Sequence, residues 1–386
     1  MIAPVLRLLA SVYELRESTR QFLYRAGVFS AYSLPAPVIS VGNLTSASGK
    51  TPLVSHLARH YHQFHGINSL IIQLGEGTVD EAIMLEQEFQ GTPIRVVETS
   101  NPVELRDILL DDPSLELVFL DNGLQHLPLM RDLDIITLNA FSPLGNGHLR
   151  PRGSLRESPR PALRRADAAV IHHVDIAGEE KSTQARRNIE HVGIPRHTLR
   201  IESMMMPIML RLIISSKPTL DMSCDSTELG EFIGLSALEK SAVVCLTGVG
   251  SPITVEAHAK KLGAIHVEGC GSNEDHHIFN IDEVDDAVRR IRFLMKDSRF
   301  KHVCLLMTEK DFWRQRHFWS SVLMRYSNEI WDGKSTGSMQ QKWGAYLLHS
   351  ELQLLSHDSR FSSESAMWGA MLRLAMDHYR GRSYSM

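Results

Sequence analysis

Residues 38–61 read VISVGNLTSASGKTPLVSHLARHY, and this stretch decides the fold class. Val38 to Val41 form a short run typical of a buried strand, and a helical stripe of apolar residues follows from Leu53. Gly49-Lys50-Thr51 lies where the helix should open, and Pro52 suits the first turn because its missing N–H is not needed there. A strand, a loop and a helix that opens with Gly-Lys-Thr form the arrangement of a phosphate-binding loop.

This loop departs from the usual pattern in its glycines. Leu44 lies five places before Gly49, where glycine is expected, and residues 46–48 are Ser, Ala and Ser. Backbone N–H groups at a helix N-terminus still attract phosphate. Lys50 would reach the terminal phosphates and the Thr51 hydroxyl would bind Mg²⁺, whereas the alternative is an ordinary helix start. We therefore expect a nucleotide to be held by Thr45, Ser46, Ala47, Ser48, Gly49, Lys50 and Thr51.

Strand and helix patterns alternate along the chain. Apolar runs at 69–73, 115–120, 134–138 and 168–172 predict an α/β fold, a P-loop NTPase-like parallel sheet with helices on both faces. The pattern restarts near Ser241, with a strand at 242–246, a helix at 281–295 and a strand at 302–307. These elements predict a second, smaller α/β domain. The expected divisions are an N-terminal helix in 1–36, a P-loop kinase domain in 37–225, and the smaller domain with a C-terminal tail in 226–386, including a polar loop at 331–341.

Composition narrows the function classes. The net charge of -4 provides no overall basic field, so no nucleic-acid partner is expected. No uninterrupted apolar run reaches membrane-spanning length. The four cysteines have no CxxC spacing and suggest small buried residues in a reducing compartment.

The first thirty residues mix large apolar side chains with arginines. A helix here could lie in a membrane interface, with Arg7, Arg16, Arg20 and Arg25 toward anionic head groups. It could equally be a core-facing packing helix or part of a targeting sequence. Two acidic residues, Glu14 and Glu17, argue against a transit peptide.

Two further stretches carry candidate chemistry. Asp121 ends the apolar run LELVFLD, and an aspartate at the end of a buried parallel strand can hold Mg²⁺ opposite a phosphate-binding loop. The segment at 141–161, FSPLGNGHLRPRGSLRESPRP, is rich in glycine, proline and arginine. Six arginines lie in or directly after this segment: Arg150, Arg152, Arg156, Arg160, Arg164 and Arg165. Such a cluster indicates contact with an anionic substrate or an anionic membrane, and the alternative is a solvated surface.

An ordered set of motifs resembles one family, tetraacyldisaccharide 4'-kinase of lipid A biosynthesis. The motifs are VGNLTSASGKTP at 41–52, DNGLQH at 121–126, GNGHLRPRGSLRE at 145–157, EDHH at 274–277 and TEKD at 308–311. They occur in the family's order and span roughly residues 5 to 315. The stretches around residues 22–45 and 169–175 look most like the plant-type members.

The resemblance implies the activity and the roles of individual residues. It implies an ATP- and Mg²⁺-dependent lipid kinase that phosphorylates the 4'-hydroxyl of a tetraacyldisaccharide 1-phosphate at a membrane. Lys50 and Thr51 take the loop roles, and Asp121 takes the metal role with Glu157 as an additional metal contact. Asp80 occupies the position of the aspartate that acts as the general base in the family, and His276 in the second domain would orient this carboxylate. The resemblance also implies that the protein is associated with a membrane. In a plant the location would be mitochondrial, and in a bacterium it would be the cytoplasmic face of the inner membrane.

Departures from the family pattern leave an alternative open. The phosphate loop is one residue shorter than the family's and lacks its paired glycines. Asn122 stands where the family has a second aspartate, and Leu74 and Glu76 replace an arginine and an aromatic residue. The alternative is a non-catalytic paralogue that keeps the fold and binds nucleotide or lipid without turnover.

Overall fold

The computed structural model describes residues 2–45, 48–74, 79–99, 101–214, 227–233, 238–270, 276–330 and 343–383. It divides into two compact units. Unit 1 comprises Met1–Met204 and Leu352–Met386, and unit 2 comprises Met205–Glu351. The sequence prediction placed the division after residue 225 and assigned the C-terminal segment to the smaller domain. In the structure the division lies after Met204, and the C-terminal segment Leu352–Met386 belongs to unit 1.

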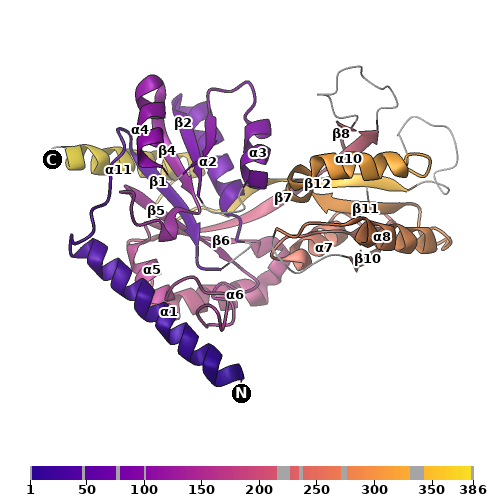
Figure 1. The fold of residues 1–386 in the computed structure, drawn as a ribbon, viewed down its shortest axis with the longest axis horizontal. Coiled ribbons are helices and arrows are strands. Elements are labelled where there is room, and N and C mark those ends of the chain that lie inside the picture. Colours follow the sequence, from indigo (N-terminus) through magenta and orange to yellow (C-terminus); the bar gives the residue numbers. More distant parts are fainter. Residues whose placement is uncertain are drawn as a thin grey trace. The chain divides into compact units, whose positions relative to one another are not determined.

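Unit 1 is built on a parallel sheet with the strand order β7-β6-β5-β1-β4-β2-β3 (Figure 1). The strands and the short helix between two of them are β1 (Val38–Asn43), β2 (Asn68–Gln73), β3 (Arg95–Glu98), β4 (Leu115–Asp121), η1 (Gly123–Gln125), β5 (Leu133–Asn139), β6 (Ala168–His172) and the start of β7 (Leu199–Ile214). The helices are α1 (Ile2–Arg25), α2 (Lys50–His65), α3 (Val79–Glu88), α4 (Pro102–Asp111), α5 (Pro159–Arg165), α6 (Val174–Val192) and α11 (Glu364–Ser383).

Helices cover both faces of this sheet, as the fold class predicts. Side chains alternate between faces along a strand, so Val38 and Val118, which are paired in register, share one face. One buried cluster on that face includes Leu105 of α4, and another contains residues of α5 and α6. On the opposite face Tyr61 of α2 stacks on Phe119 of β4, with ring centroids 6.1 Å apart.

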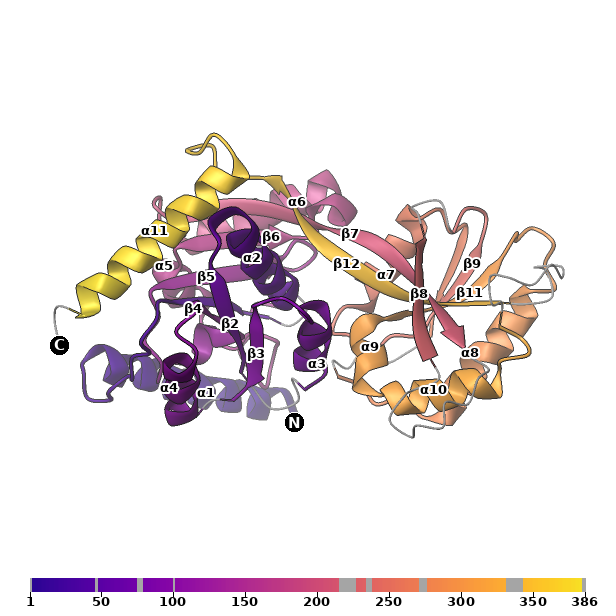
Figure 2. The same cartoon turned by 90° about the horizontal axis from the view of Figure 1, so that it is seen from above.

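The C-terminal helix α11 packs on α2 in unit 1 (Figure 2). The Tyr61 hydroxyl donates to the Trp368 carbonyl at 3.0 Å, and Trp368 is fully buried. At the other end, Arg382 and the backbone N–H of Val38 both donate to the Asp132 carboxylate. These contacts explain why the segment predicted as a tail of the smaller domain belongs to unit 1.

Unit 2 has the strand order β10-β9-β11-β12-β7, and β8 pairs with β7 in antiparallel fashion. Its elements are β8 (Thr227–Ile233), β9 (Ala242–Cys245), α7 (Pro252–Lys261), β10 (His266–Gly269), α8 (Ile281–Leu294), β11 (Val303–Thr308), α9 (Glu309–Arg314), α10 (Arg316–Arg325) and β12 (Gly344–Ser356). The three cysteines described here, Cys245, Cys270 and Cys304, are free and buried, as expected. The predicted loop at 331–341 lies outside the described residues.

The amino-terminal segment forms one long helix, α1. Its Tyr13, Arg20 and Gln21 side chains contact other parts of unit 1, and most of its large apolar residues are exposed. In the part of the chain that the structure describes, we find no helix with both the length and the apolar character to cross a membrane.

Candidate active site

The predicted site residues of unit 1 gather at one edge of its sheet. Strands β1, β2, β4, β5 and β6 pair in parallel, so their carboxyl ends share that edge. After β1 the chain continues to β2, which lies on one side of β1 in the sheet. After β4 it continues to β5, which lies on the other side of β1. A reversal of this kind opens a crevice at the strand ends, where α/β proteins bind their ligands.

The phosphate-binding loop connects β1 to α2, as the sequence predicts. Gly49 adopts a left-handed conformation with φ 76°, immediately before Lys50 opens the helix. A Cβ at Gly49 would lie 2.4 Å from Cδ2 of His172, so the close approach of that buried imidazole also requires glycine. Ser46 and Ala47 lie outside the described residues.

The two ends of the loop are held by polar contacts. The Asn43 amide donates to the Thr45 carbonyl, and the Ser48 and Thr137 hydroxyls are hydrogen-bonded at 2.8 Å. The Thr45 and Ser48 side chains are buried. The contact of these two residues with phosphate stays a prediction.

Asp121 ends β4 and is fully buried beneath the start of α2. Its Oδ2 accepts a 2.9 Å hydrogen bond from the Gln73 amide, whereas its Oδ1 has no hydrogen-bond partner among the described residues. Desolvation, followed by the charge of Glu81, raises the pKa of Asp121, while Lys50, the Thr51 hydroxyl and Gln73 oppose the rise. The strand end therefore holds a carboxylate that lacks a full set of partners.

Helix α3 contributes two acidic residues in its first turn, Asp80 and Glu81, and both are buried. The sequence motifs indicate Asp80 but not Glu81, whose charge acts on Asp121. Two adjacent acidic residues at the start of a helix that follows a sheet strand were the available signal. Buried acidic side chains normally require compensation, so this pair marks the edge as a polar site.

Asn122 does not fill the place of a metal-binding aspartate. Its backbone is left-handed, with φ 64°, a conformation that asparagine tolerates better than most residues. Its amide donates to the Leu74 carbonyl at 3.0 Å, and its oxygen accepts from the guanidinium of Arg156. Asn122 thus places Arg156, which the sequence singled out only as one of six arginines, near the end of β4.

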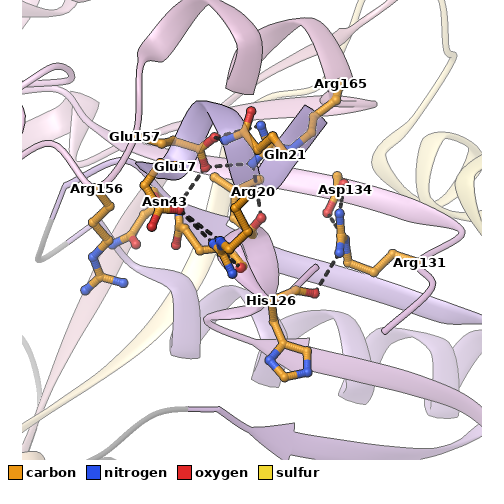
Figure 3. Close-up of polar contacts among 12 residues, drawn as sticks. Glu17, Arg20, Gln21, Asn43, His126, Arg131, Asp134, Arg156, Glu157 and Arg165 are labelled. Carbon is orange, nitrogen blue, oxygen red and sulfur yellow. Dashed lines mark hydrogen bonds and ion pairs between the residues drawn. The ribbon is translucent and has the colours of Figure 1, made fainter. Parts of the chain in front are cut away.

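Glu157, for which the family resemblance implies a metal contact, is engaged by neighbouring side chains in this structure. Its carboxylate accepts two hydrogen bonds from Arg165, at 2.6 and 2.8 Å, and further bonds from Gln21 and Gln125 (Figure 3). Glu157 is 1% exposed, and both of its oxygens are occupied. Glu157 thus joins α1, η1 and α5, and the guanidinium of Arg165 offsets its buried charge. Its contact with a metal stays a prediction.

His276 lies in unit 2. Its backbone is left-handed, with φ 62°, and its N–H donates to the Gly248 carbonyl at 3.1 Å. Asp311 of the TEKD motif accepts from the Gly248 N–H, and Arg314 donates to Asp311 and to the His277 carbonyl. The TEKD motif therefore shapes the loop that carries His276, while the pairing of His276 with Asp80 stays a prediction.

A glycine-ended loop that opens a helix beside a buried strand-end aspartate, on a parallel sheet, defines a P-loop protein with a kinase fold. A family model described as tetraacyldisaccharide-1-P 4'-kinase matches residues 2–77 and 76–349. The chain belongs to the tetraacyldisaccharide 4'-kinase family.

Individual relatives agree with this assignment. The "Probable tetraacyldisaccharide 4'-kinase, mitochondrial" of Arabidopsis thaliana is 31% identical over 81% of this chain and 80% of its own length. The tetraacyldisaccharide 4'-kinase of Halothermothrix orenii is 28% identical over 80% of this chain and 81% of its own length. The crystal structure of LpxK from Aquifex aeolicus in complex with ATP has a TM-score of 0.57 and 20% identity, covering 97% of this chain and 99% of that chain, which supports the fold.

Proposed function

We propose that this chain transfers the γ-phosphate of ATP to the 4'-hydroxyl of a tetraacyldisaccharide 1-phosphate, forming a bisphosphorylated lipid. The observation that carries the proposal is the buried Asp121 carboxylate beside Thr51, below the phosphate-binding loop, in a chain of this family. Phosphoryl transfer requires positioning and charge neutralisation more than covalent chemistry. The edge of unit 1 offers both.

The nucleotide phosphates would be held by the start of α2. Backbone N–H groups at its N-terminus and the Lys50 ammonium offer positive charge where the phosphates lie. Arg156, hydrogen-bonded to Asn122, adds a guanidinium at the same edge. A guanidinium suits the charge that spreads over the transferred phosphoryl oxygens.

The residues at the end of β4 fit a magnesium ion. Mg²⁺ prefers oxygen ligands, and Asp121 has a buried oxygen without a hydrogen-bond partner among the described residues, next to the Thr51 hydroxyl and the charge of Glu81. Thr51 and Asp121 would hold the ion. When bound, Mg²⁺ supplies charge neutralisation at the phosphate oxygens.

Asp80 is the proposed general base, and His276 is the proposed partner that orients it. The carboxylate would accept the proton of the 4'-hydroxyl as the hydroxyl oxygen attacks the γ-phosphorus, the bond from that phosphorus to the β,γ-bridging oxygen breaks, and ADP leaves. Asp80 belongs to unit 1 and His276 to unit 2. Assembly of the pair on substrate binding would exclude water, which competes with the sugar as phosphoryl acceptor.

The lipid substrate requires access to a membrane surface, and α1 has a suitable face. Apolar residues at helical spacing lie on one side of α1 and are each at least 47% exposed: Val5, Leu8, Leu9, Val12, Leu15 and Phe22. On the opposite side, Arg20 donates to the Gln125 carbonyl and Gln21 to Glu157. Of the alternatives left open by the sequence, we propose a helix docked by one face with the other in an anionic membrane interface.

The cellular compartment of the protein depends on whether the chain comes from a plant or a bacterium. Membrane association through α1 would place the protein at a mitochondrial membrane in a plant, and at the cytoplasmic face of the inner membrane in a bacterium. The curated plant relative carries the word mitochondrial in its name.

One observation favours the second candidate, a non-catalytic paralogue. Both polar ends of the Asn122 side chain are engaged by Leu74 and Arg156, so this residue brings neither charge nor an open ligand to a metal. Such a protein would bind ATP tightly and transfer nothing.

A labelled-transfer assay separates the two functions. The full chain is incubated with γ-labelled ATP, Mg²⁺ and tetraacyldisaccharide 1-phosphate in detergent, and the lipid products are resolved. We expect a bisphosphorylated lipid from the wild type and none from Lys50→Ala, with Lys181→Ala as a matched control because Lys181 is exposed on α6. ATP binding by calorimetry without any labelled lipid would assign the chain to the paralogue.

A further inference from the structure

A cluster of metal-binding side chains lies between α2 and α11, apart from the residues of the proposed active site. His56 and His60 are one helical turn apart on α2, and Glu364 lies in the first turn of α11. Among the described residues, these three form a group whose ligand atoms all lie within 4.8 Å of one another. Both helices belong to unit 1, so the cluster is internal to one compact unit.

A second observation points to a ligand at this place. His60 is 7% exposed, and its Nε2 atom has no hydrogen-bond partner in the part of the chain that the structure describes. A buried polar atom without a partner is costly and uncommon in native proteins, and an ion is one way to satisfy it.

The surroundings of the cluster resemble those of a protein metal site. Glu364 Oε1 accepts hydrogen bonds from His56 Nε2 at 2.7 Å and from Trp368 Nε1 at 3.1 Å. The indole N–H would remain as an outer contact that orients the carboxylate when a metal replaces the histidine bond. The side chains of His56 and Glu364 are 21% and 33% exposed, which gives an ion a path from solvent.

We propose that His56, His60 and Glu364 bind one Zn²⁺ ion, with water at the fourth position, and that this ion fastens α11 to α2. Two imidazoles and one carboxylate suit zinc, whereas Mg²⁺ and Ca²⁺ prefer all-oxygen sites. Tetrahedral zinc places its ligand atoms about 3.3 Å apart. Small side-chain rotations from the separations described would achieve this geometry.

The bound ion would act on the helix that carries the nucleotide loop. Lys50 and Thr51 open α2, and His56 follows within two turns. Zinc would add a cross-link to the contact that already joins Tyr61 and Trp368. Its expected effect is therefore on the stability of unit 1 and not on a step of phosphoryl transfer.

Zinc calorimetry on the full chain tests the proposal. Chelator-treated protein, free of nucleotide and Mg²⁺, is titrated with ZnCl₂. We expect one equivalent to bind, and Zn²⁺ to raise the thermal unfolding midpoint. His60→Asn and Glu364→Gln should each weaken binding by about 10-fold or more, since even outer-contact changes cost about 10–100-fold. His62→Asn is the matched control, because His62 lies on the same helix but contacts Asn68.

Any of three results would overturn the proposal. The first is a wild type that does not bind Zn²⁺, the second is equal affinity for Zn²⁺ in Glu364→Gln and the wild type, and the third is binding of Mg²⁺ to the same place as tightly as Zn²⁺. Glu364→Gln carries the test even if the buried His60 variant fails to fold, because Glu364 is partly exposed and glutamine preserves its size.

Discussion

At the scale of single residues, Asp121 shows how the proposed site opposes stability. Its carboxyl group is fully buried, and desolvation together with Glu81 raises its pKa. A carboxyl group whose pKa is higher in the folded state binds its proton more tightly there. Its contribution to stability is therefore lost as the pH rises from the ordinary carboxyl range through the raised pKa. At neutral pH without a cation, the folded chain bears this cost.

Asp121→Asn should therefore stabilise the metal-free protein while abolishing phosphoryl transfer. Asparagine keeps the oxygen that accepts from Gln73 and removes the buried charge. Denaturant unfolding of wild type and variant should show a stability gain at neutral pH that disappears at acid pH, below the ordinary carboxyl pKa. A variant less stable than wild type at neutral pH would show that Asp121 is compensated in the folded chain.

Glu157 provides the opposite case, a buried carboxylate with a full set of partners. Breaking its pair with Arg165 leaves a guanidinium that is mostly buried. Glu157→Gln should lower the free energy of unfolding by about 3 kcal/mol. It should leave the Mg²⁺ dependence of ATP binding unchanged.

Glu180→Gln is the control for this variant, because Glu180 is exposed on α6. A Glu157 variant of normal stability that needs much more Mg²⁺ to bind ATP would restore the metal role that the family resemblance implies.

The sequence predicted some of these residues and missed others for physical reasons. Asp121 could be placed because a continuous apolar run fixes the end of a buried strand. The Arg165 partner of Glu157 could not, because spacing along a loop does not reveal which charges meet. Glu81 was missed because its effect on Asp121 depends on how near the start of α3 lies to the end of β4, and the sequence alone does not show that distance.

At the scale of elements, α1 has a docked face and an exposed apolar face, whose surroundings the sequence could not predict. The pattern of 1–36 predicted a helix, which is confirmed, but an amphipathic pattern does not tell whether its apolar face meets protein or lipid. The structure docks the polar face, through Arg20 and Gln21. Arg7, Arg16 and Arg25 are exposed and flank the apolar residues.

Replacing Leu8, Val12 and Leu15 by glutamine should greatly reduce co-sedimentation with vesicles that contain anionic lipid. These side chains are exposed in the protein, so the fold should tolerate the change while the apolar contact with lipid is lost. Changing Arg7, Arg16 and Arg25 to glutamine should produce a smaller loss, greatest at low salt, because screening shortens the reach of charge to about 8–10 Å.

Leu110→Gln is the matched control for the membrane test, since Leu110 is an exposed leucine on α4, 55% accessible. Vesicle binding that survives the triple change in α1 would leave this helix as a packing element and remove it from the proposed membrane surface.

At the scale of the whole molecule, the two α/β units were predicted and their boundaries were not. A helical pattern with buried Met367, Trp368 and Met371 shows that α11 has an apolar face, but not which core receives it. Strands β7 and β12 each run across the division between the units, so no polar linker marks it in the sequence. The pairing of Asp80 with His276 likewise rests on family resemblance.

We propose that this chain is an active kinase in which Asp80 of unit 1 is the base and His276 of unit 2 is its partner. The rate of transfer to the 4'-hydroxyl, measured for wild type, Asp80→Asn, His276→Ala and the double variant, tests it most directly. We expect Asp80→Asn to remove most of the rate with ATP affinity nearly intact. His276→Ala should cost less, within about 10²–10⁴-fold. The double variant should be hardly slower than Asp80→Asn, because the two residues serve one proton transfer. Strictly additive losses would contradict the pairing of Asp80 with His276, and a wild type that binds ATP tightly and transfers no phosphate would contradict the kinase activity.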